Sequence, residues 1–281
     1  METSNNNRWI RYQGALLWNG LPDNLPPTEQ QASKALQEHK GMFARWTSGF
    51  DCGYATEWWY CICDSFTPIS ELTAKQRYRV NKGLKQCEIV MAKNDSRTDK
   101  YAIYEVVKKS FEDYPAAYRP HLEKDDFFLH LNKLLHDDAI DIWLVYSEQN
   151  TLVGYCQCTK TGNAVWLTQV KVPTAYLGLE VNAALVYTLC DYYLNTHHYR
   201  YICDGERNIK HQTNYQDFLV RVLNFRYAYC KLNIIYSWWM KLAVSVLYPI
   251  RNLIKWCGQK NQFIYNVYCV LKQEEIRRSF L

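Results

Sequence analysis

Asp204, His211 and Tyr215 lie in one short stretch of the sequence and are the residues best suited to move protons. Asp204 follows an apolar run, where burial would raise the pKa of its carboxyl group enough for it to accept a proton from an amine. His211 is the competing general base, and Tyr215 is a candidate general acid. A structural interpretation stays open, because Asp204-Gly205 is also a turn pair and His211 suits a surface loop.

Arg207 and Trp59 are candidates for holding a substrate. Arg207 could pair with an anionic group of a substrate, or it could cap the edge of a strand. Trp58 and Trp59 are neighbours in a strand-like run (57–63), so one indole should pack inward while the other faces the opposite side. An indole on that side could stack on a sugar ring. Alternatively, it belongs to the core or covers the sheet.

Three cations of a predicted helix (69–85) share one side. Lys75, Arg79 and Lys82 follow one another at i, i+4 and i+7, with Val80 and Leu84 roughly opposite. One face can therefore pack while the other presents positive charge. That charge either binds a phosphate group of a substrate or forms an ordinary solvated face.

The elements that must position these residues follow one another in an unusual order. The expected order is a strand (87–93), two helices (100–114, 123–136), three strands (141–147, 151–159, 164–172), a helix (177–194), a strand (199–203), a helix (213–223) and a strand (225–236). Turn residues between the three central strands predict an antiparallel meander. A helical crossover predicts that the strand after it runs parallel to the third one.

This order resembles the GNAT superfamily of acyl-CoA N-acyltransferases. The resemblance implies an α/β, GNAT-like fold, in which helices flank a mixed, mainly antiparallel sheet, here with N-terminal and C-terminal additions. It also implies acyl transfer to an amine. In that fold the acyl donor lies between the third meander strand and the parallel strand, which would bring Asp204 near the reacting atoms.

The stretch Arg79-Val-Asn-Lys-Gly-Leu-Lys85 resembles the Arg/Lys-rich helix of the FemAB-like branch of this superfamily. That branch transfers aminoacyl or acyl groups to amino groups of cell-envelope precursors. The resemblance therefore implies that Lys75, Arg79 and Lys82 bind a substrate. It also allows an aminoacyl-tRNA as donor.

The turn after the third meander strand is where the superfamily binds the diphosphate of acyl-CoA. At that place the resemblance implies donor binding by Val172, Tyr176, Gly178 and Asn182. The sequence departs from the family pattern at four points. In the turn, Tyr176 or Leu177 replaces an Arg or Gln, and Glu180 replaces the second glycine. Further on, Val220 stands where a tyrosine is expected, and Asn224 replaces a glycine. A carboxylate at Glu180 would either oppose a diphosphate or stabilise the positive end of a helix.

Composition sets the boundaries of the interpretation. The chain has 281 residues and a net charge of +5, too modest by itself to indicate nucleic-acid binding. Its 11 cysteines form no CxxC pair, so we expect no metal site and a reducing, cytoplasmic compartment. The polar N-terminus has no signal-peptide pattern.

Three regions are expected along the chain: an N-terminal segment (1–86), an acyltransferase-like core (87–236) and an aromatic, basic extension (237–281).

The C-terminal extension suggests a peripheral membrane contact through residues 237–257. No uncharged run there exceeds about nine residues, too few for a span. On a helix, Lys241, Arg251 and Lys255 share one sector and the aliphatic residues the other, with a kink at Pro249. The alternative is a helix that docks on the core or on a second copy.

We therefore expect a cytoplasmic N-acyltransferase, peripheral on the inner face of the membrane. It would use an acyl-CoA or aminoacyl donor and an amine of a sugar or a lipid-linked envelope or polysaccharide intermediate as acceptor. The alternative function is a catalytically inactive GNAT-fold module that binds a glycan or a membrane-associated partner.

Overall fold

The computed structural model describes residues 9–112, 114, 119–210, 214–259 and 261–280. The chain forms two compact units. Unit 1 comprises Met1–Tyr60, Glu206–Thr213 and Ala228–Leu281, and unit 2 comprises Cys61–Gly205 and Asn214–Tyr227. The basic helix that we expected within 1–86 thus belongs to unit 2, while the extension 237–281 belongs to the same unit as the first 60 residues.

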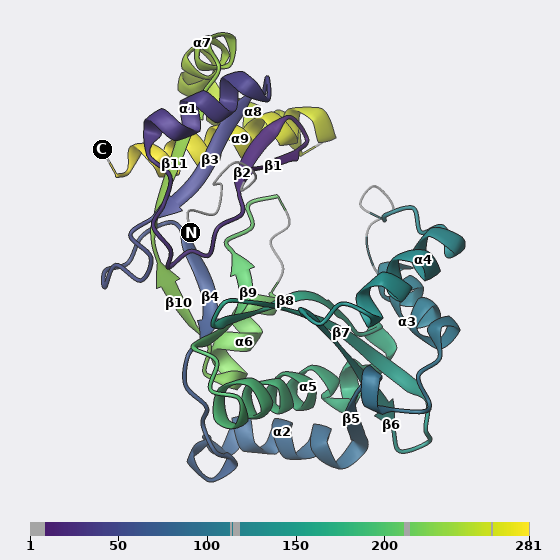
Figure 1. Cartoon of the computed structure of the whole chain (residues 1–281). Helices are drawn as coiled ribbons and strands as arrows, with labels where there is room; N and C mark the ends of the chain where they lie inside the picture. The colour runs from purple at the N-terminus through teal and green to yellow at the C-terminus, as the bar shows by residue number, and fades with distance from the viewer. Residues whose placement is uncertain (1–8, 113, 115–118, 211–213, 260, 281) are drawn as a thin grey trace, which may run out of the picture. The chain divides into compact units, whose positions relative to one another are not determined.

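A seven-stranded sheet forms the centre of unit 2 (Figure 1). Its strands, in spatial order, are β10 (Arg226–Tyr229), β4 (Trp59–Cys63), β9 (Tyr201–Glu206), β8 (Ala164–Lys171), β7 (Leu152–Thr161), β6 (Ile140–Ser147) and β5 (Cys87–Met91). The pairs β5–β6, β6–β7 and β7–β8 are antiparallel, and β8–β9 is parallel. The predicted meander and the predicted parallel strand are both confirmed.

Helices cover both faces of this sheet (Figure 1). One face carries α3 (Lys100–Glu112) and α4 (Lys124–Leu135); the other carries α2 (Ala74–Gln86), α5 (Val181–Cys190) and α6 (Tyr215–Leu223). Alternation along β6 explains the two layers, because Ile142 and Leu144 belong to the α3–α4 core, whereas Trp143 and Val145 belong to the other. The predicted fold class, a mainly antiparallel mixed sheet flanked by helices, is confirmed.

Unit 1 contains a four-stranded sheet. Its order is β1 (Trp9–Tyr12), β2 (Ala15–Trp18), β3 (Phe43–Ser48) and β11 (Lys231–Tyr236). The helices of this unit are α1 (Glu29–Glu38), α7 (Trp238–Leu247), α8 (Arg251–Gly258) and α9 (Gln262–Arg278). Thr28 begins α1 with a capping box to Gln31, and Leu16, Leu36 and Trp46 are buried together between helix and sheet.

Two expected elements are divided in the structure. The predicted strand 225–236 is two strands, β10 and β11, which belong to different sheets. The predicted helix 177–194 is a 3₁₀ turn η4 (Thr174–Leu179), then α5, then a π-helical turn η5 (Asp191–Thr196). Shorter 3₁₀ turns are η1 (Ile69–Glu71), η2 (Ala92–Asn94) and η6 (Tyr248–Ile250).

Candidate active site

Strands β8 and β9 part in the middle of the sheet of unit 2. They pair only from Ala164 with Tyr201 to Trp166 with Cys203, although β8 continues to Lys171. A bulge at Thr168 also shifts the register of β8 against β7 between Gln157 and Cys158. We call this region, Leu167 to Lys171 on β8 with Asp204 and Gly205 on β9, the β8–β9 fork. A strand whose backbone groups lose their ladder partner can pair with an extended ligand.

Asp204 lies at the fork, directly after the last residue that pairs with β8. Burial raises the pKa of its carboxyl group to about 7, while a hydrogen bond from the side chain of Gln216 on α6 acts in the opposite direction. Near neutral pH this carboxyl group can therefore either accept or donate a proton, as a general base requires. Burial is the cause of the raised pKa that the sequence suggested, while the role of Asp204 as a general base stays a prediction.

Tyr215, the first residue of α6, places a buried hydroxyl group close enough to Asp204 for the two charges to interact. Burial is the main cause that raises the pKa of this hydroxyl group well above its usual value, so it stays protonated at neutral pH. Its oxygen has no hydrogen-bond partner among the residues that the structure describes. Unpaired buried hydroxyl groups are uncommon because they lose the hydrogen bonds that water would supply.

Thiols complete the surroundings of this pair. Cys61 on β4 and Cys156 on β7 lie close enough to Asp204 to be affected by its charge. Burial raises the pKa of Cys61, and a hydrogen bond between Cys156 and Cys158, together with burial, raises that of Cys156, so both are neutral thiols at physiological pH. In the sequence, only their position on apolar, strand-like runs connects these cysteines with the site.

The turn between β8 and α5 is the predicted donor turn. Val172 and Tyr176 are half-buried against the α5 side of the sheet. A Cβ atom at Gly178 would meet nothing within 4 Å, so packing does not require glycine there. Glu180 follows in the left-handed conformation, with φ of 59°.

Arg79 on α2 pairs with the carboxylate of Glu180. Its Nε donates to Oε2 at 2.8 Å and its Nη2 lies 2.7 Å from the same oxygen, while the guanidinium lies 4.9 Å from the centre of the Phe218 ring. Arg79 was expected to bind a phosphate group, and Glu180 is the residue that replaces a glycine of the family's turn. The ion pair brings these two residues together. Lys75 and Lys82, on the same helix, form no salt bridge with any residue in the described part of the chain.

A hollow of about 170 Å³ lies beside the donor turn on the α3 side of the sheet. Tyr176 lines it together with Glu105 and Lys109 of α3 and Thr151 before β7. Ligand pockets are usually larger, roughly 300 to 1,000 Å³, so this hollow would hold part of a ligand. Lys109 supplies a cation near the donor turn, and no motif in the sequence indicates it.

Asn182 lies in the first turn of α5. Its Oδ1 atom is buried and, among the described residues, has no hydrogen-bond partner. Among the described residues of unit 2, it shares this unfilled hydrogen bond with the Tyr215 hydroxyl group and with Oε1 of Gln86. Such a group gains from a ligand that supplies the missing partner.

Arg207 and Trp59 lie together in unit 1. The guanidinium of Arg207 is 4.6 Å from the centre of the Trp59 ring, and Arg207 also donates to the backbone carbonyl of Glu57. Trp58 is buried and donates to Glu206 at 3.2 Å, so the two indoles do face opposite sides, as expected. The division into units falls within β4, after Tyr60, so Trp59 and Arg207 count with unit 1, whereas Asp204 and Tyr215 count with unit 2. His211 lies outside the described residues.

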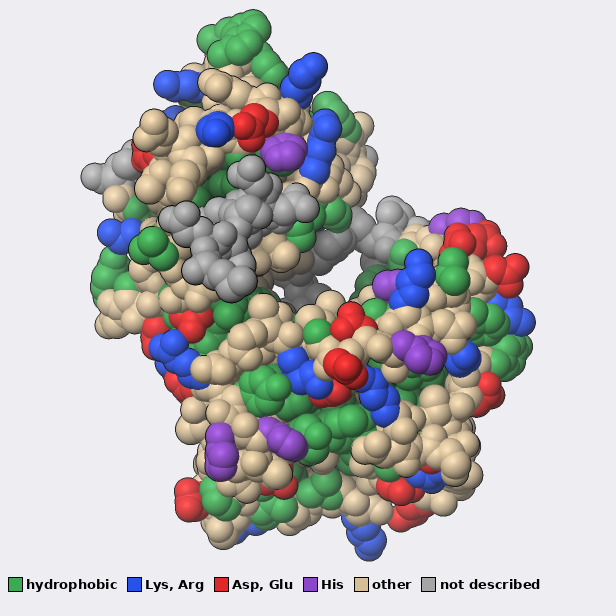
Figure 2. Space-filling model, in the orientation of Figure 1, with side chains coloured by type: hydrophobic (Ala, Val, Ile, Leu, Met, Phe, Trp, Pro, Cys, Tyr) green, Lys and Arg blue, Asp and Glu red, His purple; other side chains and the backbone are tan. Residues whose placement is uncertain are grey.

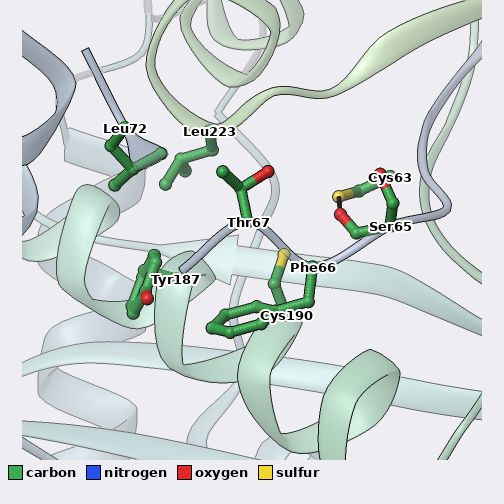
Figure 3. A pocket seen from close by; sticks show the side chains of 8 residues that line it. All are labelled: Cys63, Ser65, Phe66, Thr67, Leu72, Tyr187, Cys190 and Leu223. Carbon is green, nitrogen blue, oxygen red and sulfur yellow. Dashed lines mark hydrogen bonds between the residues drawn. The ribbon is translucent and has the colours of Figure 1, made fainter. Parts of the chain in front are cut away.

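A small cavity of about 10 Å³ lies elsewhere in unit 2, between β4, α5 and α6 (Figure 3). Cys63, Phe66, Tyr187 and Cys190 are among its lining residues. Its volume suits about one water molecule. None of the predicted site residues lines it, so it is not a candidate for substrate binding.

The sequence matches no protein-family profile, and curated proteins include no significantly similar sequence. Similar solved structures include a functionally unknown conserved protein from Staphylococcus epidermidis ATCC 12228, with 12% identity over 79% of this chain and 84% of that one and a TM-score of 0.46. FemX has 12% identity over 71% of this chain and 67% of its own, also with a TM-score of 0.46. A spermidine N-acetyltransferase from Vibrio cholerae, solved with CoA and spermine, has 18% identity over 42% and 69%, with a TM-score of 0.35. These similarities concern the fold.

Proposed function

We propose that this GNAT-fold protein is an N-acyltransferase that moves an acyl or aminoacyl group onto an amine of a sugar or lipid-linked envelope or polysaccharide intermediate. The observation that carries the proposal is the β8–β9 fork with Asp204 and Tyr215 beside it. The fork offers backbone groups to an extended donor arm, and the two side chains offer a base and an acid.

The proposed reaction needs no covalent intermediate on the protein. The neutral amine attacks the carbonyl carbon of the donor, a C–N bond forms, and Asp204 takes the proton that the amine loses. The C–S or C–O bond of the donor then breaks, and the hydroxyl group of Tyr215 gives a proton to the leaving sulfur or oxygen. Because Asp204 and Tyr215 are close enough for their charges to interact, the proton can return from the carboxyl group to the phenolate.

The donor is either an acyl-CoA or an aminoacyl ester such as an aminoacyl-tRNA. The fork suits the extended arm of the former. For its diphosphate, however, the turn offers Glu180, whose charge is balanced by Arg79, rather than a run of glycines. Lys75, Lys82 and Lys109, with Val172, Tyr176, Gly178 and Asn182 of the turn, are the residues that we propose to hold the anionic part of either donor.

Arg207 and Trp59 are proposed to bind the acceptor. An indole can stack on a sugar ring, and a guanidinium suits the phosphate groups of a lipid-linked or nucleotide-linked intermediate. Such acceptors lie at the inner face of the membrane, so a cytoplasmic protein that contacts the membrane peripherally is the proposed setting. No helix in the described part of the chain is both long and apolar enough to cross a bilayer.

A second candidate function is a GNAT-fold module that binds a glycan or a membrane-associated partner without catalysis. The Arg79–Glu180 ion pair favours it, because this pair occupies the turn that would otherwise be free for a diphosphate. The two functions differ in their dependence on Asp204. Replacing it by asparagine removes the base but leaves the shape of a binding surface nearly unchanged.

Thermal unfolding in the presence of donors tests the proposal. We expect acetyl-CoA, a longer acyl-CoA, free CoA or an aminoacyl-tRNA to raise the melting temperature, because a ligand at 100 times its Kd adds about 2.7 kcal/mol to the stability of the folded state. Asp204→Asn should keep that binding and lose transfer to a pool of amino sugars. If no donor shifts the melting temperature and Asp204→Asn supports every cellular function, the binding module is the correct account.

A further inference from the structure

The C-terminal helices of unit 1 expose an unusual number of large apolar side chains. These residues run through α7, η6, α8 and the start of α9: Trp238, Trp239, Leu242, Val246, Ile250, Leu253, Trp256 and Phe263. Trp238 is 82% exposed, Trp256 65% and Phe263 74%. Exposed apolar residues are normal when scattered singly, whereas a series of them on consecutive helices marks a surface that contacts something apolar.

On α7 these side chains occupy one sector of the helix. Trp238, Leu242 and Val246 follow at intervals of four residues, which keeps them within about 80° of one another. Met240 and Val244 point to the other side and are buried in unit 1. Figure 2 shows hydrophobic side chains gathered over α7 at the top of the view, with Lys and Arg side chains next to them. The packing of α7 on its own unit therefore leaves this sector uncovered.

The same part of the chain is free of acidic charge. No Asp or Glu occurs from 218 to 273, a stretch that carries eight Lys and Arg residues. Lys241 and Lys255 are exposed among the apolar side chains, and neither forms a salt bridge with a described residue. The first carboxylates after this stretch are neutralised by neighbours, Glu274 by Arg277 and Arg278, and Glu275 by Lys272 and Arg251.

The helices are shaped to lie on a surface rather than to cross one. Pro249 lies in η6, between α7 and α8. Because proline has no backbone N–H group, it cannot continue the hydrogen bonds of α7, and the helix ends there. The pieces on either side have 10 and 8 residues. A helix of about 20 apolar residues would be needed to span a bilayer.

We infer that α7, η6 and α8 form a docking surface for an anionic lipid bilayer. Tryptophan and aliphatic side chains would enter the boundary between headgroups and acyl chains, while Lys241 and Lys255 contact anionic headgroups. A second copy of this chain fits less well, because a symmetric contact would bring the cations of the two copies together. The inference specifies the membrane contact of the proposed setting, but it does not depend on acyl transfer.

Flotation of the full chain with vesicles tests the docking surface. We expect the protein to float with vesicles of phosphatidylcholine and phosphatidylglycerol at low salt, and to stay at the bottom with phosphatidylcholine alone. Raising the salt to about 1 M should release it, since the Debye length then falls to about 3 Å. Binding to both kinds of vesicle with no effect of salt would contradict the role of the cations.

Two pairs of substitutions test the residues. Leu242→Glu with Val246→Glu should weaken flotation about tenfold or more, and Lys241→Glu with Lys255→Glu should have a similar effect. The matched control is Leu129→Glu with Tyr78→Glu, which adds the same charge at exposed apolar positions of unit 2 (58% and 65% exposed) and should float like the original chain.

Sedimentation and an activity variant separate the remaining outcomes. If the wild-type chain does not float but sediments as a dimer that Leu242→Glu with Val246→Glu dissociates, the surface belongs to a second copy and the inference is wrong. If those variants float as well as the control, it is wrong too. Asp204→Asn should float normally, so a failure of acyl transfer and a failure of membrane binding can be told apart.

Discussion

Asp204 and Tyr215 are the residues whose chemistry depends most on their surroundings. Burial raises the pKa of the Asp204 carboxyl group to about 7 and that of the Tyr215 hydroxyl group well above its usual value. At neutral pH a buried acid without a hydrogen-bond partner, Tyr215, therefore lies close enough to Asp204, a carboxyl group that can take up or release a proton, for their charges to interact. A purely structural core would gain from giving the Tyr215 hydroxyl group a partner and from replacing the buried Asp204 by an apolar side chain, and this cost in stability is typical of groups kept for function.

The pKa of Asp204 predicts how stability depends on pH. In the unfolded chain its pKa is about 3.9, so the folded state binds the proton more tightly. Stability should therefore fall as pH rises from about 4 to about 7, and level off above that. Urea unfolding of Asp204→Asn should show a flatter profile across this range and a higher stability at pH 8. Asp138→Asn, at a fully exposed carboxylate, is the control and should keep the original profile.

The unpaired hydroxyl group of Tyr215 gives a second prediction. Tyr215→Phe should leave stability unchanged or raise it, because no hydrogen bond is lost and the stacking on Phe218 is kept. Tyr227→Phe is the contrast: its hydroxyl donates to Asp217 at 2.9 Å, and its loss should cost about 0.5 to 1.5 kcal/mol. Transfer activity should fall at least tenfold in the first variant alone. Equal destabilisation of both would mean that the Tyr215 hydroxyl group has a partner.

At the scale of elements, the packing of α2 against α5 explains why the stretch 79–85 has its pattern. A Cβ atom on Gly83 would lie 2.5 Å from the carbonyl oxygen of Glu180 and 2.8 Å from Cβ of Ala184. Arg79, one turn earlier, forms the ion pair with Glu180. The glycine lets the two helices approach closely, and the arginine balances the carboxylate at the start of α5. The basic helix thus positions the donor turn, whatever its remaining cations bind.

Two glycines allow a matched test of this packing. Gly83→Ala should destabilise unit 2 by about 1 to 3 kcal/mol, because backbone atoms must move to admit the methyl group. Gly178→Ala, in the donor turn, meets nothing within 4 Å and should change stability by less than about 0.5 kcal/mol. Chemical denaturation measures both. A Gly83→Ala chain as stable as the original would show that α2 and α5 are not closely packed.

At the scale of the whole molecule, residues within 237–281 form part of the hydrophobic core of unit 1. Residues of α9 are buried in unit 1, among them Leu271 and Ile276, and the Tyr236 hydroxyl group donates to Glu274 at 3.0 Å. A chain truncated after Tyr236 should therefore lose the cooperative unfolding of unit 1 and become insoluble. A chain that ends at Arg278 should stay soluble. Equal solubility of the two would mean that 237–281 is an independent addition.

The sequence predicted most of unit 2 because its strands are long, apolar and separated by clear turns. It did not predict β1, β2 or β3, since strands of four to six residues carry little periodicity. The run 225–236 looks like one strand, and only tertiary pairing divides it at Cys230. For the site, residue types pointed to Asp204 and Tyr215, whereas the ion pair between Arg79 and Glu180 joins positions 101 residues apart and has no local signal.

The measurement that tests the central claim most directly is the rate of acyl transfer against pH for the wild-type chain and for Asp204→Asn. Labelled acyl-CoA or aminoacyl-tRNA would be offered with a pool of amino sugars and lipid-linked amines. We predict transfer whose rate rises through pH 7, as Asp204 loses its proton, and then levels off, with a loss of about 10² to 10⁴ in the variant. A variant that transfers as fast as the wild-type chain at pH 8, or a wild-type chain that transfers from neither donor, would contradict the account.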